Sequence, residues 1–402
     1  MENRDRLAYL AILLFGLVSL FGDIIYEGAR GIISPYLEFL GATAIIVGIV
    51  GGVGDFIGYA LRLVSGYLAD VKKTYWLFVF LGYGLLITVP LLAFAPHLSF
   101  LAPAWVIASI LVILERLGKA LRSPARDTLL SVTTKDIGAG KAFGLHEFMD
   151  QLGAIIGPSI MAIILYLTNN EYFYAFSIMF IPYVILVVIL FLAYSRLKEA
   201  TEEVMKETRQ QTQERRARLP RRFYMYAFAV FLNTSGLLSA LLILYVASYL
   251  AHLPAWEVSV LFIIIQGVDA LVAPLAGFIY DRVGISLLTV PFVLSILPTF
   301  FALQGSRQMV YLAALSFGII LGMQESVYRA AVSDITTVEA RGTAYGFFST
   351  LYGAGFLVSG AIFGLFIEYN LYIMAVIYTL LVQFLGIALL LLSAKTKNFT
   401  TK

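Results

Sequence analysis

The chain has 402 residues, of which 60% are hydrophobic and only 13% are charged, and its formal net charge is +3. Soluble domains carry about 25% charged residues, so this composition excludes a soluble enzyme, a nucleic-acid-binding protein and a disordered protein. The chain has no cysteine, and its three histidines, His97, His146 and His252, lack the spacing of metal ligands. We therefore expect a membrane protein with several spans and with neither a metal nor a cofactor.

Twelve apolar stretches are long enough to cross the bilayer, which takes about 20 residues in a helix. Their continuous apolar character differs from the alternating strands of a membrane barrel. The stretches lie at 7–36, 42–69, 75–95, 102–131, 140–167, 171–195, 223–250, 255–280, 285–304, 308–333, 341–367 and 369–393. We predict an all-α membrane protein with twelve transmembrane helices.

One long polar segment, residues 196–222, divides these stretches into six and six. We expect an N-terminal six-helix bundle at 1–195, a cytoplasmic linker that is partly an amphipathic helix, and a C-terminal six-helix bundle at 223–402. Twenty of the 28 Lys and Arg residues fall on the side that holds the linker, and only Arg307 falls on the other side. Because basic residues mark the cytoplasmic loops, we expect a multi-pass protein of the cell membrane with both termini in the cytoplasm.

The two halves share a weak internal repeat. The sequence GYLAD at 66–70 follows the second stretch, and GFIYD at 277–281 follows the eighth. A second pair, SVTT at 131–134 with GKAFG at 140–144, matches SDIT at 333–336 with GTAYG at 342–346. Two landmarks in the same order predict duplicated, pseudo-symmetric halves with a central cavity between them near the bilayer midplane.

Twelve spans, a basic central linker and a Gly-x-x-x-Asp loop in both halves resemble the major facilitator superfamily over the whole chain. The second loop continues with the family's Asp-Arg-x-Gly pattern, whereas the first has Lys72 and Lys73 in its place. The sequence GAIIGP at 153–158 resembles a motif of the antiporter branches, and segments 117–127 and 142–150 resemble a prokaryotic group of efflux permeases. The resemblance implies a transporter that works by alternating access, and we expect a monomer.

A set of residues is predicted to act in gating rather than in the choice of substrate. The glycines allow helices to approach closely, and the loop aspartates can contact a helix N-terminus or a neighbouring arginine. Static turn clamps and simple helix packing remain the alternatives for these positions. The set comprises Gly66, Asp70, Arg122, Arg126, Gly153, Gly157, Pro158, Gly277, Asp281 and Arg282.

Charges within a span cost about 2.5 to 3.5 kcal/mol each, so they should face a cavity or one another. In the first span, Asp23, Glu27 and Arg30 point within about 60° of one another around the helix. The fourth span carries a stripe of charge that should meet acids of the adjacent fifth span. We expect six carboxylates to couple transport to protons: Asp23, Glu27, Asp55, Glu115, Glu147 and Asp150.

The candidate substrate-binding residues lie in both halves. The C-terminal half has fewer buried charges, and its polar side chains, Tyr245 and Gln383 among them, are expected to shape the substrate site. The candidates are Arg30, Arg62, Arg116, Lys119, His146, Asn233, Gln266, Asp269, Glu325, Arg329 and Tyr352. Structural ion pairs that only hold the bundle together are the alternative for all the buried charges, and Glu325 with Arg329 have the spacing of such a pair.

The leading hypothesis is a secondary active transporter that exports a small organic compound or drug in exchange for protons. The second is proton- or ion-coupled uptake of a nutrient or organic anion, because the arginines and Lys119 could bind a carboxylate or phosphate. The third is a membrane sensor that transports nothing. We do not expect an enzyme, because the sequence has no nucleophile–base pair, metal motif or P-loop. The expected partners are a small molecule, protons and the lipid bilayer, with no nucleic acid.

Overall fold

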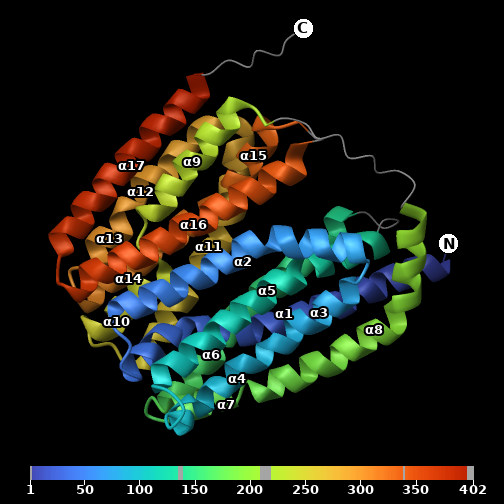
Figure 1. The fold of residues 1–402 in the computed structure, drawn as a ribbon, viewed down its shortest axis with the longest axis horizontal. Helices are drawn as coiled ribbons and strands as arrows, with labels where there is room; N and C mark the ends of the chain where they lie inside the picture. The colour runs from blue at the N-terminus through green and yellow to red at the C-terminus, as the bar shows by residue number, and fades with distance from the viewer. Residues whose placement is uncertain (1, 135–138, 209–218, 338–339, 396–402) are drawn as a thin grey trace. The chain divides into compact units, whose positions relative to one another are not determined.

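A computed structural model describes residues 2–134, 139–208, 219–337 and 340–395, and these residues are almost entirely helical, without a β-strand (Figure 1). The first half contains α1 (Glu2–Phe39), α2 (Ala44–Lys72), α3 (Tyr75–Gly84), α4 (Thr88–Leu91), α5 (Ala104–Thr133), α6 (Ala139–Leu167), α7 (Tyr172–Ser177) and α8 (Phe180–Thr208). The rest contains α9 (Arg221–Ser235), α10 (Ala240–Tyr249), α11 (Ala255–Val283), α12 (Thr289–Leu294), α13 (Ile296–Ala302), α14 (Arg307–Met323), α15 (Arg329–Ile335), α16 (Arg341–Glu368) and α17 (Tyr372–Lys395).

Ten helical segments among the described residues are long and apolar enough to cross a membrane. One of them, Ala255–Ala302, has 48 residues and contains two predicted spans, α11 and then α12 with α13. The predicted fourth span forms the 30-residue helix α5 but is not one of the ten. Its Glu115, Arg116, Lys119, Arg122 and Arg126 lower its apolar character. The protein is therefore an all-α membrane protein with about twelve spanning helices.

The predicted linker begins as a continuation of a membrane helix. Helix α8 runs from Phe180 to Thr208, well past the predicted end of the sixth span at residue 195. The tail of this helix is the part of the linker that we expected to be helical. Most of the rest of the linker, residues 209–218, lies outside the described residues.

The helices pack into two compact units. The first comprises Met1–Ile33 and Leu61–Glu214, and the second comprises Ser34–Ala60 and Arg215–Lys402. In the first unit α3 packs along α5, and in the second α9 packs against both α16 and α17, while α11 packs along α14 (Figure 1). The division differs from the predicted halves at residues 34–60, which pack with the second unit.

Glycines on α2 and α16 explain why residues 34–60 belong to the second unit. A Cβ atom placed at Gly52 would lie 2.8 Å from the Cα of Leu357, and one placed at Gly364 would lie 2.7 Å from the carbonyl oxygen of Ala44. Gly48 and Gly360 face each other with the same lack of space. Side chains at these positions would separate the helices, so the glycines permit backbone contact between α2 and α16.

Glycines also allow close backbone contact between α1 and α6 in the first unit. A Cβ atom at Gly153 would lie 2.7 Å from the carbonyl oxygen of Leu20, and one at Gly157 would lie 2.9 Å from the backbone nitrogen of Gly28. Pro158 follows within α6. The Gly-x-x-x-Gly-Pro element is therefore a close helix crossing, and it sets the distance between the charged residues of α1 and α6.

Candidate functional site

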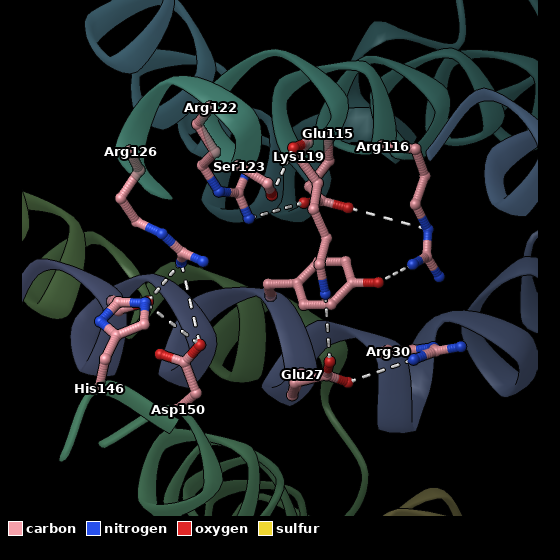
Figure 2. Close-up of polar contacts among 12 residues, drawn as sticks. Glu27, Arg30, Glu115, Arg116, Lys119, Arg122, Ser123, Arg126, His146 and Asp150 are labelled. Atoms are coloured by element: carbon pink, nitrogen blue, oxygen red, sulfur yellow. Dashed lines mark hydrogen bonds and ion pairs between the residues drawn. The ribbon is translucent and has the colours of Figure 1, made fainter. Parts of the chain in front are cut away.

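The first unit contains a continuous cluster of charged side chains from three helices (Figure 2). Helix α5 contributes a row of charges that runs along one face, since residues spaced three, four and seven apart lie on the same side of a helix. Helix α1 contributes Glu27 and Arg30, and α6 contributes His146 and Asp150. Figure 2 shows Lys119 pointing towards Glu27, and Arg126 pointing towards His146 and Asp150. Of the acids of α6 that were expected to meet the α5 stripe, Asp150 does so through Arg126.

Glu115 lies at the buried centre of the cluster. Its carboxylate lies 3.7 Å from a guanidinium nitrogen of Arg122 and 3.9 Å from Nε of Arg116. These three residues are no more than 4% exposed. A buried carboxylate between two buried guanidinium groups offsets charge that would be costly in a medium of low dielectric.

Glu27 forms a second ion-pair group nearer the surface of the unit. Its Oε2 lies 3.6 Å from Arg30, one turn along the same helix, and its Oε1 lies 3.7 Å from Nζ of Lys119 on α5. The Arg30 and Lys119 side chains are 21% and 25% exposed, whereas the Glu27 side chain is 8% exposed. Glu27 therefore pairs both with Arg30 of its own helix and with Lys119 of α5.

Tyr26 is the aromatic centre of this region. The Lys119 ammonium lies 3.8 Å from the centre of its ring, and the guanidinium groups of Arg116, Arg122 and Arg30 lie at 4.8, 6.0 and 6.0 Å. Arg116 also donates a hydrogen bond to the Tyr26 hydroxyl. Because cations are attracted to the face of an aromatic ring, Tyr26 can stabilise several positive charges at close range.

The far end of the stripe has a more acidic balance. Arg126 pairs with Asp127 at 2.8 Å and with Asp150 at 3.9 Å, and it donates a hydrogen bond to Ser19 at 2.7 Å. His146 Nε2 lies 3.6 Å from the same Asp150 carboxylate. Arg126 therefore connects α5 to both α1 and α6.

Asp23 and Arg62 extend the cluster electrostatically. Asp23 interacts with Asp150, Lys119, Glu27 and Arg122, so it lies between the two ends of the cluster. Arg62, on α2, interacts with Lys119. Asp55, two turns before Arg62 on the same helix, belongs to the second unit.

Glu147 does not have the burial that the sequence analysis expected. It is exposed, whereas its neighbour His146 is 3% exposed. Successive helical residues point about 100° apart, so the face that carries His146 and Asp150 into the cluster turns Glu147 outward. The expectation of a buried Glu147 was wrong.

The second unit contains a buried network of uncharged polar side chains, centred on Asn233 of α9. Asn233 Nδ2 donates hydrogen bonds to Gln383 and to Ser295, at 2.8 and 3.0 Å, and Asn233 Oδ1 accepts hydrogen bonds from Tyr328 and Gln324 at 2.8 and 3.0 Å. The Tyr352 hydroxyl donates to Gln324 at 2.9 Å. Asn233, Tyr352 and Gln383, all predicted to shape the substrate site, thus belong to one network.

A π-helical turn, Gln324–Tyr328, separates α14 from α15 and carries part of this network. The wider turn changes the helix register, which directs Gln324 and Tyr328 into the interior and leaves Glu325 and Arg329 exposed. No ion pair joins Glu325 and Arg329 among the described residues, so the pair expected from their spacing is absent.

The remaining candidates of the second unit have separate surroundings. Gln266 and Asp269 of α11 are 6% and 2% exposed. The ring of Tyr352 meets that of Tyr59 edge-on, with ring centres 4.9 Å apart. Tyr245, also buried, stacks on Tyr249 with ring centres 5.4 Å apart.

The two loop motifs differ in their contacts. Gly66 packs against Pro124 of α5, since a Cβ there would lie 3.3 Å from the proline ring, but a Cβ at Gly277 would meet no atom within 4 Å. The expectation that Gly277 allows close helix approach was therefore wrong. Asp70 accepts a hydrogen bond from the Tyr75 hydroxyl at 2.8 Å rather than pairing with an arginine.

At the second motif, Asp281 is exposed and the Arg282 guanidinium lies 4.1 Å from the centre of the Phe278 ring. The link to another helix comes from Tyr280, whose hydroxyl donates a hydrogen bond to Asp334 at 2.8 Å. In both motifs a tyrosine hydroxyl donates to an aspartate, although the residues occupy different positions of the repeat.

Sequence reasoning missed four residues of these sites: Tyr26, Ser295, Gln324 and Tyr328. Helical spacing could have found Tyr26, because it precedes Arg30 by four residues and therefore shares its face. Gln324 and Tyr328 also have i,i+4 spacing, but the π-helical turn that turns both inward has no evident signal in the sequence. Among the described residues, no group of three or more His, Asp or Glu side chains is arranged to hold a metal ion.

The protein is all-helical, has about twelve spans and holds a cluster of charged side chains between its helices. This is the architecture of a multi-pass transporter. The family model of the Major Facilitator Superfamily matches residues 12–303, and the chain belongs to this family. It is therefore a membrane transporter of small molecules and not an enzyme.

Related proteins and solved structures agree with the family. The chain is 38% identical over 361 residues to the uncharacterised protein Rv2265 of Mycobacterium tuberculosis, covering 89% of this chain and 86% of that one. It is 27% identical over 384 residues to an uncharacterised MFS-type transporter, MJ1317, of Methanocaldococcus jannaschii, covering 90% of each.

The solved structures include the nucleoside transporter NupG, with a TM-score of 0.69, 14% identity and coverage of 96% of this chain and 100% of that one. They also include a POT family transporter in complex with 5-aminolevulinic acid, with a TM-score of 0.69, 12% identity and coverage of 95% and 94%. At these identities the structures share the fold with this chain.

Proposed function

We propose that the protein is a secondary active transporter that works by alternating access and is coupled to protons, with Glu27 as a principal proton-carrying group. The observation that carries the proposal is the position of Glu27. Its carboxylate is buried, it lies between Arg30 and Lys119, and both of these cations are partly exposed. The accessible cations beside it offer a route by which a proton could reach this buried carboxylate.

Protonation of Glu27 would change the charge balance of the cluster. A charge in a span is costly unless it is compensated, and neutralising Glu27 removes one ion-pair partner from each of Arg30 and Lys119. A conformation that brings these cations to water or to another anion then becomes favoured, which shifts the equilibrium between states. Asp23, Glu115 and Asp150 belong to the same cluster and are secondary candidates for the proton site.

Two forms of proton coupling use the same site. The first is export of a small organic compound by exchange with protons, which the GAIIGP element and the resemblance to efflux permeases support. The second is uptake of an organic anion together with a proton. The excess of cations near Tyr26 supports the second form, because an anionic solute would complete the charge balance.

The positive residues on the linker side support a cell-membrane protein with both termini in the cytoplasm. The two six-helix halves and the linker remain the proposed division of the chain, and we propose that it acts as a monomer.

Proton flux in proteoliposomes tests the proposal. The purified protein is reconstituted with a pH-sensitive dye in the lumen, and a panel of labelled solutes is added outside without an initial pH gradient. Symport acidifies the lumen as the solute enters, whereas exchange makes the lumen more alkaline. A solute that is transported without any change in lumenal pH would contradict proton coupling, and protein-free liposomes give the background.

A further inference from the structure

The cations around Tyr26 divide into an inner and an outer set. The inner set, Arg116 and Arg122, is paired with Glu115, and its side chains are 5% and 3% exposed. The outer set, Arg30 and Lys119, is paired with Glu27, and its side chains are 21% and 25% exposed. The outer set is therefore the more accessible of the two to a bound solute.

Glu27 is held loosely by the outer set. Its contacts of 3.6 and 3.7 Å are longer than the roughly 3.2 Å limit of a good hydrogen bond. The buried Oε2 atom makes no hydrogen bond. By contrast, Arg126 and Asp127 approach to 2.8 Å. Glu27 thus balances the charges of Arg30 and Lys119 without forming the short, charge-assisted hydrogen bonds that a carboxylate can make with such cations.

The end of the cluster near Tyr26 carries more positive than negative charge. The four cations are Arg30, Arg116, Lys119 and Arg122, and the three carboxylates are Asp23, Glu27 and Glu115. With every group ionised the region has one positive charge in excess, and protonation of Glu27 raises the excess to two. A bound anion would reduce this excess, which is costly within the membrane.

We propose that Arg30 and Lys119 bind the carboxylate or phosphate group of the transported solute, and that Glu27 occupies this site until it takes up a proton. Glu27 then acts as an internal competitor. Its proton enters with the anion, and both leave when Glu27 ionises again and reclaims the cations. The proposal rests on the proton-coupled transport proposed above and favours its second form, uptake of an organic anion.

The groups that face Glu27 support the competition. From its own helix these are Asp23 and Arg30, and from α5 they are Glu115 and Lys119. Lys119 in turn faces Arg62 of α2, and Asp23 faces Asp150 of α6. Of the carboxylates in this set, Glu27 is the one with direct ion pairs to the two accessible cations.

Anion binding to the purified full-length protein in detergent tests the proposal. The probes are benzoate, inorganic phosphate and, as a neutral analogue of benzoate, benzamide, measured by calorimetry at about pH 5.5 and about pH 8. We expect the wild type to bind benzoate, phosphate or both at least about tenfold more tightly at the lower pH. Preference for one probe identifies whether the site takes a carboxylate or a phosphate. Benzamide should not bind at either pH.

Substitutions separate competition from a general effect of charge. Glu27→Gln should bind the anion at both pH values as tightly as the wild type does at the lower one. Lys119→Gln should weaken anion binding about tenfold or more, and Lys119→Arg should restore it. Glu171→Gln and Lys198→Gln make the same charge changes at exposed positions of the first unit and should behave as the wild type. Thermal unfolding of each variant confirms that the protein is folded.

The proposal is overturned if neither anion binds at about 10 mM, if wild-type affinity for benzoate is independent of pH, or if Glu27→Gln retains the pH dependence. Equal binding of benzamide and benzoate would also overturn it. The assay requires no transport, so its failure leaves proton coupling to be judged by proton flux. If the wild-type protein binds the anion but its transport moves no protons in proteoliposomes, the proposed function is contradicted instead.

Discussion

At the scale of the residue, burial distinguishes two carboxylates that look alike in the sequence. Glu115 is enclosed with Arg116 and Arg122, whereas Glu27 contacts cations that remain partly exposed. We expect a fully enclosed ion pair to contribute more to stability than to transport, because removal of one partner leaves an uncompensated buried charge. An accessible pair can exchange its partner for a proton or for a solute. The two acids should therefore respond differently to the same substitution.

Glu115→Gln should destabilise the protein. Arg122 and Arg116 would lose their buried counter-charge, and we expect a loss of about 3 kcal/mol in the free energy of unfolding. Thermal unfolding in detergent measures the effect. Glu199→Gln, which makes the same change at an exposed position of α8, is the matched control. Equal stability of Glu115→Gln and the control would contradict a structural role for Glu115.

Asn233→Leu should destabilise the second unit. The substitution removes the side-chain partner of Gln383, Gln324, Tyr328 and Ser295, and leaving such buried groups without hydrogen bonds costs about 2 to 4 kcal/mol. The substitution Gln304→Leu, at an exposed position of the turn that follows α13, serves as control. Chemical unfolding followed by tryptophan fluorescence gives the difference, and a stable Asn233→Leu would indicate that the network is not fully formed.

At the scale of the element, glycines set how closely helices approach, and the sequence motif located one such crossing correctly. Residues 153–158 suggested tight packing, and the structure places Gly153 and Gly157 against the α1 backbone. Their partner helix could not be read from the motif, because the partner Gly28 has no pattern of its own. The π-helical turn at Gln324–Tyr328 was unpredictable for a related reason, since it depends on tertiary hydrogen bonds to Asn233.

Gly157→Ala should loosen the contact between α1 and α6. The added methyl group would collide with the backbone of Ile24 and Gly28, and we expect a loss of about 1 to 3 kcal/mol together with slower transport. Gly144→Ala lies on the same helix, where a Cβ meets no atom within 4 Å, and should be neutral or slightly stabilising. Thermal unfolding and initial transport rates compare the two variants, and equal behaviour would refute a crossing that depends on Gly157.

At the scale of the whole molecule, composition and length predicted the class of fold, and the spans agree closely with the observed helices. The low charged fraction excluded soluble folds, and the same scarcity identified the buried charges as candidates for function. Which charges contact one another was only partly predictable. Helical spacing found the stripe on α5 and the pair of Glu27 with Arg30, but the packing of residues 34–60 with the second unit depends on contacts between distant segments.

The end of α1 and helix α10 both belong to the second unit, and a cross-link between them should stop transport if the end of α1 leaves α10 during alternating access. Ser248 donates a hydrogen bond of 2.6 Å to Glu38, and the chain has no natural cysteine, so a Glu38→Cys, Ser248→Cys variant contains only two thiols. A short bifunctional thiosulfonate reagent should abolish transport, and a reducing agent should restore it. Each single-cysteine variant treated in the same way is the control. Full transport by the cross-linked protein would show that these two segments stay together throughout the cycle.

The most direct test of proton coupling through Glu27 compares two transport modes of Glu27→Gln, using a solute identified by proton flux. Counterflow exchanges labelled for unlabelled solute and needs no net proton movement, whereas accumulation against a gradient does. We predict that Glu27→Gln retains counterflow within about twofold of the wild type but loses proton-driven accumulation by about tenfold or more. Accumulation at the wild-type level in Glu27→Gln, driven by the same pH gradient, would contradict the assignment of Glu27 as the proton-carrying group.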